Sequence, residues 1–431
     1  MTTNTFKALG ISEDTSTILE KKGYKNPTDI QGMLIPKFLG SSDDIIAKAD
    51  TGTGKTGAFG IPLIDSMDAS NNSVQAMALA PTRELASQVA KELTSYKGRR
   101  KIQIIELCGG QGMREQINQL KQMKQPTIVV GTPGRILDHI NKKRLKLQAL
   151  SYLIIDEVDE MLNFGFKEDM DKIVGQTNPD RRTIILSATL PKFVLKVAQT
   201  YLTDPIQLDC AKDPSQKPDI EQVYYKVNKV NKVKLLTRVM DSLVGFYGFV
   251  FCNTKRDVDQ LAEKLIQLGY AAESMHGDLS QAQRNRALAK FKSKQCDILV
   301  VTDVAARGID IKNISHVINY SVPQNLEAYT HRIGRTGRAG QSGTAITFVK
   351  DSEFFKFKRI IKIQKNGIQK KEVPNVKDIL AIKKQRLLSD LAELNLKGHH
   401  YELAKTILEK YDPETAVAAL LKLRYSDFFG N

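Results

Sequence analysis

Cysteine is scarce in this chain of 431 residues, and the four that occur are far apart. They are Cys108, Cys210, Cys252 and Cys296. No CxxC spacing occurs, so the sequence predicts neither a disulfide framework nor a zinc site, and we expect four reduced, buried thiols. The pair His399-His400 has no cysteine or third histidine nearby, so we do not interpret it as a metal site.

Long apolar runs are also absent. No run approaches the ~20 residues that a membrane-spanning helix needs. The N-terminal residues 1–5 lack the basic start and apolar core of a signal peptide. We therefore expect a cytoplasmic protein with no membrane partner.

The charge of the chain is strongly unbalanced. It contains 64 Lys and Arg against 48 Asp and Glu, a net charge of +16. Such an excess indicates a polyanionic partner, either nucleic acid or an anionic membrane surface, and the missing apolar runs make the membrane the weaker candidate. The apolar content of 41% is ordinary for a globular protein, and the length suits two domains and an appendage.

Two series of short β-rich runs alternate with helical patterns. The first extends from Ile45 to Leu208 and the second from Val223 to Phe348, with a polar, proline-bearing stretch between them. Strands separated by helices predict mostly parallel sheets covered on both faces. We thus predict α/β domains at residues 1–210 and 220–355, joined by a linker at 211–219, with ligands at the carboxyl ends of the strands.

Residues 356–431 differ in pattern from both domains. Residues 356–386 hold eleven Lys and Arg and two acids, a local charge of +9 that would add affinity for nucleic acid without sequence preference. From Val376 to about Arg424, leucines at three- and four-residue spacings predict about three helices, interrupted at Gly398 and Asp412-Pro413. We predict a small α-helical module here.

A phosphate-binding loop follows the apolar run at residues 45–47. Its residues are Thr51, Gly52, Thr53, Gly54, Lys55 and Thr56. The glycines let backbone N–H groups surround phosphates, Lys55 reaches the β- and γ-oxygens, and the Thr56 hydroxyl is a Mg²⁺ ligand. Ala49 stands where the general pattern has its first glycine.

Two adjacent carboxylates end another predicted strand, Tyr152-Leu153-Ile154-Ile155. Alone they would fit a solvated acidic turn. With the phosphate-binding loop they indicate nucleotide hydrolysis, with Asp156 as a Mg²⁺ ligand and Glu157 activating the attacking water.

The chain resembles the DEAD-box ATP-dependent RNA helicases, whose motifs occur in the expected order from Phe6 to Arg338. The resemblance implies two RecA-like domains in tandem. Residues 23–31 resemble the family's Q motif, which implies that Gln31 binds the adenine edge, that Phe6 stacks on the ring, and that ATP is preferred to GTP. By the same resemblance, Asp310 holds the ribose.

Segments in both domains resemble the family's RNA-binding motifs. This resemblance implies that their residues contact the sugar–phosphate backbone. In the first domain these residues are Pro81, Thr82, Arg83, Gly110, Thr132, Pro133 and Arg135. In the second they are Thr254, Gln281, Arg284, Thr302 and Gly308. Taken singly, each also fits a helix start, a tight turn or a surface loop.

A third group resembles the motifs that couple hydrolysis to strand separation. It comprises Asp159, Ser187, Thr189, His331 and Arg332. The segment after His331 resembles the family's arginine fingers, which implies that Arg335 and Arg338 neutralise charge on the transferred phosphoryl group. Because Lys55 and Glu157 belong to the other domain, hydrolysis would require the two domains to close.

Several readings stay open. An ATP-gated RNA clamp or assembly scaffold fits the same motifs as a helicase that unwinds short duplexes, and DNA remodelling is a third reading. Residues 377–424 resemble the dimerisation module of some bacterial cold-shock DEAD-box helicases, although such an apolar stripe also packs on its own domain. Whether ribosome-assembly or RNA-decay factors are partners also stays open. Val158 stands where the family usually places alanine.

Overall fold

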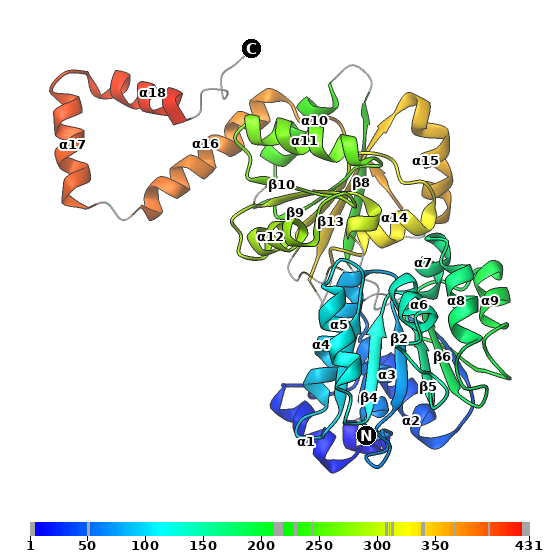
Figure 1. Cartoon of the computed structure of the whole chain (residues 1–431). Coiled ribbons are helices and arrows are strands. Elements are labelled where there is room, and N and C mark those ends of the chain that lie inside the picture. The colour runs from blue at the N-terminus through cyan, green and yellow to red at the C-terminus, as the bar shows by residue number, and fades with distance from the viewer. Residues whose placement is uncertain are drawn as a thin grey trace.

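The computed structural model describes residues 5–49, 52–210, 219–227, 231–243, 245–306, 309, 311, 314–337, 341–364, 367–394 and 397–424. Two domains with helices on both faces of a central sheet are stacked on each other, and a helical arm extends from the second (Figure 1). Each sheet has seven strands, and every strand pairing is parallel. The α/β architecture predicted from the sequence is confirmed.

The first domain contains residues 6–209 in regular elements. Its helices are η1 (Phe6–Leu9), α1 (Glu13–Lys21), α2 (Asp29–Gly40), α3 (Lys55–Asp65), α4 (Arg83–Tyr96), α5 (Met113–Lys121), α6 (Pro133–Asn141), α7 (Val158–Asn163), α8 (Lys167–Val174) and α9 (Lys192–Ala198). Its strands are β1 (Ile45–Lys48), β2 (Val74–Leu79), β3 (Gln103–Leu107), β4 (Thr127–Gly131), β5 (Tyr152–Ile155), β6 (Arg182–Ser187) and β7 (Ile206–Asp209). They lie in the order β3-β4-β2-β5-β6-β1-β7.

The second domain repeats this plan. Its helices are α10 (Lys232–Asp241), α11 (Lys255–Gln267), α12 (Gln281–Lys292), α13 (Asp303–Ala306), α14 (Leu326–Ile333) and α15 (Asp351–Ile363). Its strands are β8 (Ile220–Val227), β9 (Gly248–Phe251), β10 (Ala272–Met275), β11 (Ile298–Val301), β12 (His316–Asn319), β13 (Gly343–Lys350) and β14 (Gln369–Lys370). They lie in the order β10-β11-β9-β12-β13-β8-β14.

The central strands are short apolar runs because both faces of each sheet are covered. Every residue of β4, β9 and β11 is buried, and alternate side chains enter separate cores on the two faces. Polar side chains follow each of these strands within two residues: Thr132 after β4, Asn253 after β9 and Thr302 after β11. The fold therefore gathers the candidate functional residues at the carboxyl edges of the two sheets.

The sheet of the second domain continues past the boundary expected at residue 355. Helix α15 spans that position, and its Phe357 and Ile360 are buried in a core of the second domain. Strand β14 then adds to β8. The expected β pattern ended too early because a helix of 13 residues separates β13 from the short β14.

Three further helices follow, as the sequence predicted. They are α16 (Val376–Glu393), α17 (Gly398–Leu408) and α18 (Pro413–Arg424). Ile379 of α16 is buried and α16 contacts α10, whereas α17 and α18 lie away from both sheets (Figure 1).

The structure also shows the state of the cysteines and the length of the apolar helices. All four cysteines are free and buried, as expected. Among the described residues, no helix is long and apolar enough to cross a membrane, and no three His, Cys, Asp or Glu side chains are grouped as metal ligands would be.

Val158 provides a test of the packing beneath the acidic strand end. It is fully buried in the core that includes Ile155 and Met161. We expect Val158→Ala to cost roughly 1–3 kcal/mol of stability, because it removes two buried methyl groups. The thermal unfolding midpoint should fall by several degrees while ATP turnover stays within about twofold, because the carboxylates are unchanged.

The matched control is Val304→Ala, because Val304 is 50% exposed. It should leave the unfolding midpoint unchanged. A large loss of turnover in Val158→Ala would show instead that the acidic turn itself depends on valine.

Candidate functional site

The phosphate-binding loop lies between β1 and α3, and glycine is required at its end. Gly54 precedes α3 with φ +90°, a left-handed conformation that favours glycine. A Cβ there would come within 2.6 Å of Nε2 of Gln31. The loop then leads into Lys55 and Thr56, which are 7% and 8% exposed. Backbone and side-chain donors at this helix start form a site suited to phosphate.

Lys55 faces the first acid of the strand end that follows β5. Its Nζ lies 4.0 Å from Oδ1 of Asp156, and among the described residues neither atom has a hydrogen-bond partner. Burial raises the pKa of the Asp156 carboxyl to about 7, although the Lys55 charge opposes the shift. Buried charged atoms without partners are costly. Phosphate and Mg²⁺ would satisfy both, so the donor set of Lys55, Asp156 and Thr56 fits this pair of ligands.

Glu157 has an unusual backbone conformation. Its φ of 54° and ψ of 52° are left-handed, which is uncommon for a residue with a side chain. Such a conformation costs of order 1–3 kcal/mol and occurs often at active sites. It turns the chain directly from β5 into α7 and leaves the Glu157 side chain 8% exposed beside Asp156.

Asp159 connects the acidic turn to the end of β6. Its Oδ2 accepts hydrogen bonds from the backbone N–H of Thr189 at 3.0 Å and from the Thr189 hydroxyl at 2.8 Å. These two residues, which the family resemblance places in one functional group, are thus in direct contact. The Ser187 hydroxyl instead donates to the Thr189 carbonyl, so it shapes the turn and does not contact the acid.

Gln31 and Phe6 lie on the side of the loop where the Q motif is expected. Gln31 is 3% exposed, and its Nε2 donates to the carbonyl of Gly54 at 3.1 Å while its Oε1 accepts from the N–H of Thr28. Although Gln31 belongs to α2, it is therefore not an exposed helix residue. The ring of Phe6 is 4% exposed and packs edge-on against Tyr24 in the first core.

The RNA-motif residues of the first domain lie at three neighbouring strand ends. Thr82 follows Pro81 and caps α4 by accepting from the N–H of Leu85. The Arg83 guanidinium covers the turn that follows β3, where a Cβ on Gly110 would come within 2.1 Å of its Nη1. Glycine at this position therefore makes room for the arginine.

The third strand end is that of β4, where Thr132 and Pro133 begin α6. Arg135, one turn into this helix, donates from Nη1 to Oε1 of Gln116 at 2.8 Å. Gln116 is buried and also contacts His139, so the network fixes the direction of Arg135.

In the second domain, two of the candidate threonines begin helices. Thr254 caps α11 and the Thr302 hydroxyl accepts from the N–H of Ala305. Both the helix-start reading and a role in binding a phosphate fit these positions, because a capped helix start leaves further N–H groups available.

Gln281 and Arg284 contact the first domain. Nη2 of Arg284 lies 2.9 Å from Oε1 of Glu84, and Nε2 of Gln281 lies 3.4 Å from the same oxygen. The side chains of Arg284 and Glu84 are 11% and 9% exposed, so the pair is largely removed from water. Glu84 was not among the predicted residues, although it directly follows Arg83.

A second contact joins the domains near the acidic turn. Nδ1 of His331 meets Oε1 of Glu160, and the two side chains are 11% and 3% exposed. Glu160 was also missed by the sequence analysis. Its position directly after Asp159 was the available signal, since α7 presents residues 159 and 160 at the strand edge.

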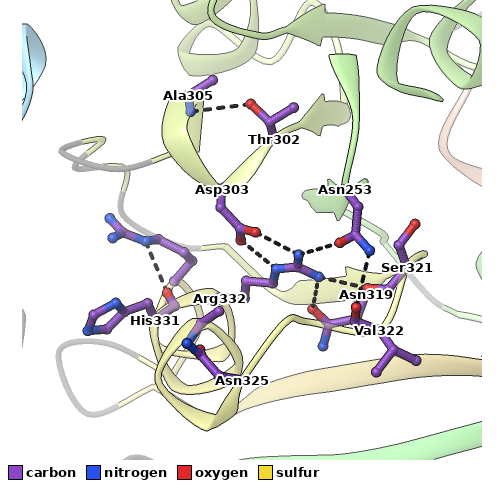
Figure 2. A network of polar contacts seen from close by, with 12 residues as sticks. Asn253, Thr302, Asp303, Ala305, Asn319, Ser321, Val322, Asn325, His331 and Arg332 are labelled. Carbon is purple, nitrogen blue, oxygen red and sulfur yellow. Dashed lines mark hydrogen bonds and ion pairs between the residues drawn. The ribbon is translucent and has the colours of Figure 1, made fainter. Parts of the chain in front are cut away.

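Arg332 binds the strand ends of the second domain together (Figure 2). It is 1% exposed and donates to both carboxylate oxygens of Asp303, at 2.5 and 2.7 Å. It also donates to the side-chain oxygens of Asn253 and Asn319 and to the carbonyl of Ser321. These partners follow or end β9, β11 and β12, so one guanidinium fixes the edge on which α14 rests.

Arg335 lies one turn beyond, where its Nη1 donates to the carbonyl of Ile309. Four predicted site residues lie outside the described residues. They are Thr51, Gly308, Asp310 and Arg338.

The Arg332 network can be tested with a substitution that keeps the charge. Arg332→Lys should destabilise the second domain by roughly 2–4 kcal/mol, because an ammonium cannot replace the planar fork and leaves buried acceptors unpaired. Arg286 is exposed, so Arg286→Lys is the matched control and should be neutral. Differential scanning calorimetry of the full chain measures both, and equal stability of the two variants would contradict the role of the network.

Comparison with known proteins agrees with this geometry. The family model described as DEAD/DEAH box helicase matches residues 28–197, and the one described as Helicase conserved C-terminal domain matches residues 231–340. DEAD-box ATP-dependent RNA helicase CshA of Geobacillus kaustophilus is 42% identical over 423 residues, which are 97% of this chain and 90% of that protein. CshA of Bacillus subtilis is 40% identical over 425 residues, 98% of this chain and 85% of that protein.

A solved structure of S. cerevisiae Dbp5 bound to RNA and ADP BeF3 is 28% identical to this chain. It covers 88% of this chain and 99% of its own, with a TM-score of 0.79. The expected tandem of RecA-like domains is therefore confirmed. The chain belongs to the DEAD-box ATP-dependent RNA helicases, a family of ATP hydrolases.

Proposed function

We propose that this protein couples ATP binding and hydrolysis to the clamping of RNA and to local unwinding of short RNA duplexes. The observation that carries the proposal is the pair of contacts between the domains, Glu84 with Arg284 and Glu160 with His331. Both adjoin motif residues. The domain that holds the phosphate loop and the domain that holds the arginine motif thus meet at the site.

ATP would occupy the phosphate loop of the first domain, from Thr51 to Thr56. Lys55 binds its phosphates, while Thr56 and Asp156 hold Mg²⁺, which neutralises phosphate charge. Gln31 and Phe6 hold the adenine. The orphaned Nζ and Oδ1 atoms of Lys55 and Asp156 support this assignment.

Glu157 orients the attacking water and accepts its proton. The second domain completes the site with Arg335, Arg338 and Asp310, the first two stabilising charge on the transferred phosphoryl group. Arg335 is 7% exposed and follows α14, the helix that carries His331 to its contact with Glu160. Its Nε donates to the carbonyl of His331. Hydrolysis therefore depends on closure.

RNA would lie across the carboxyl edges of both sheets. Arg83 and Arg135, held by their own domain, provide fixed positive charge, and helix starts at Thr82, Thr132, Thr254 and Thr302 provide N–H groups for phosphates. These contacts read no bases, so the sequence of the RNA is not selected here. A strand gripped by both domains would bend and lose its complement, and phosphate release would reopen the clamp through Asp159 and Thr189.

The alternative is an ATP-gated clamp or assembly scaffold that separates strands poorly. Strand displacement on blunt and tailed duplexes of about 12 base pairs distinguishes the two, and competition with DNA of the same sequence tests the nucleic acid. We further propose that the protein acts in the cytoplasm, with ribosome-assembly or RNA-decay factors as its partners.

Glu157→Gln tests the chemistry directly. It should lower RNA-stimulated ATP hydrolysis by about 10²–10⁴-fold, because the amide cannot accept the proton of the attacking water. RNA binding in the presence of ATP should persist or strengthen. The control Glu168→Gln changes an exposed acid of α8 and should have no effect. Unaltered turnover in Glu157→Gln, or no stimulation of the wild type by RNA, would refute the proposal.

We also propose that residues 377–424 form a homodimer. Leu391, Leu403 and Leu420 are 54%, 64% and 53% exposed in the single chain, which is unusual for so many leucines in one small module. A second copy would cover these leucines, which belong to the helical arm that extends from the second domain (Figure 1).

Sedimentation equilibrium of the full chain tests the dimer. The wild type should sediment as a dimer and the triple variant Leu391→Asp, Leu403→Asp, Leu420→Asp as a monomer, because charges would be buried at the contact. Ile266→Asp, at a 56% exposed position of α11, should remain dimeric. A monomeric wild type would contradict the proposal.

A further inference from the structure

Helix α15 exposes a large aromatic side chain on the outer side of the second domain. Phe355 is 73% exposed, whereas Phe357 on the opposite face of the helix is fully buried. Burying a phenylalanine is worth roughly 1.5–3 kcal/mol, so leaving one in water needs an explanation. Its ring is not bare, because the Arg359 guanidinium carbon lies 5.3 Å from the ring centroid.

Cations continue along the same face of α15. Lys358, Arg359 and Lys362 are exposed and stand three, four and seven residues after Phe355, spacings that place them on one side of a helix. Among the described residues, none of the three pairs with a carboxylate. The acids of the helix, Asp351 and Glu353, are confined to its first turn. We name Phe355, Lys358, Arg359 and Lys362 the α15 stripe.

The stripe rests on a rigid base. Phe357 and Ile360 anchor the other side of the helix in a core with Tyr329 of α14. Phe354 packs on Tyr224, and the Nζ of Lys226 lies 4.4 Å from the centroid of its ring. The face is therefore held in place by the packed core of the domain, so a ligand would not have to order it.

We propose that the α15 stripe is a second RNA-binding surface that takes a single-stranded segment. One unstacked base would lie on the ring of Phe355 beside the Arg359 guanidinium, and Lys358 and Lys362 would bind the phosphates on either side. Exposed aromatic rings interleaved with cations are the combination that binds single strands, because every base has a face that can stack. A duplex would use only the cations, since its bases are already stacked.

The stripe is separate from the RNA residues of the cleft. Those of the second domain follow β9, β10 and β11, whereas α15 follows β13, and β12 lies between β13 and β9 in the sheet. Figure 1 shows α12 and α15 on opposite sides of the domain. RNA on the stripe would thus keep the protein on a strand after the cleft reopens. The inference shares with the proposed function only the assumption that RNA is the partner.

The test measures the affinity of the full chain for a fluorescent single-stranded RNA without nucleotide, when closure of the cleft contributes least. Phe355→Ala should weaken binding by about 5- to 100-fold, the effect of removing one stacked base. Ile266→Ala, at a 56% exposed apolar position of α11 in the same domain, is the matched control and should bind like the wild type. Phe355 is too exposed for its loss to unfold the domain, and an unchanged thermal midpoint verifies this.

Charge is tested separately. The triple variant Lys358→Gln, Arg359→Gln, Lys362→Gln should reduce the slope of log K against log salt by about 1.4, because the two phosphate contacts of Lys358 and Lys362 on a single strand contribute roughly 0.7 each. ATP turnover at saturating short RNA should be unchanged in all variants. The triple variant should lower the affinity for double-stranded RNA, whereas Phe355→Ala should leave it unchanged.

The outcomes separate cleanly. Equal affinity of Phe355→Ala and the wild type for single-stranded RNA would overturn the α15 site and leave the proposed function standing. The α15 site would also be overturned if these variants lost affinity for vesicles rich in phosphatidylglycerol but kept their affinity for RNA, because the stripe would then bind a membrane. A wild type that bound no RNA at any salt concentration would refute both proposals.

Discussion

The structure depends on a buried ammonium and a buried carboxylate that do not satisfy each other. Lys55 and Asp156 lie 4.0 Å apart at the carboxyl edge of the first sheet, with partnerless polar atoms among the described residues. Buried charged atoms without hydrogen-bond partners cost stability, and Mg²⁺ and phosphate between them would remove that cost. The left-handed backbone of Glu157 adds strain at the same turn. The surrounding fold holds both features in place with two fully packed cores.

Closure of the domains links this site to the rest of the chain. Glu84 and Glu160 belong to the same strand edge as the phosphate loop, and each meets a residue of the second domain. Arg332 keeps the facing edge rigid by joining three strand ends, so that α14 presents His331 in a fixed position (Figure 2). Few side chains therefore decide whether the two halves meet. In the proposed function, RNA and ATP would act on the same equilibrium, because both would bind at this boundary.

Local features of the chain were predictable from its sequence, and relations between the domains were not. The strands, the phosphate loop and the acidic turn follow from apolar runs and the residues that end them, and the contact of Asp159 with Thr189 followed from the family resemblance. Glu84 and Glu160 were missed because their importance arises only when two distant segments meet. Helix α15 spans the boundary expected at 355, and the packing of Phe357 against the second domain is a contact that the sequence pattern alone does not show.

The most direct test of the account is the charge pair between the domains. Because all four native cysteines are buried, dyes can be attached to cysteines introduced at the exposed Ser70 and Ser293, and energy transfer then reports closure. ATP and RNA together should raise the closed population, Glu84→Arg should lower it, and adding Arg284→Glu should restore it, because the pair is re-formed with its charges exchanged. An energy-transfer distribution unaffected by ATP and RNA, or by reversing Glu84, would contradict the claim that closure completes the site.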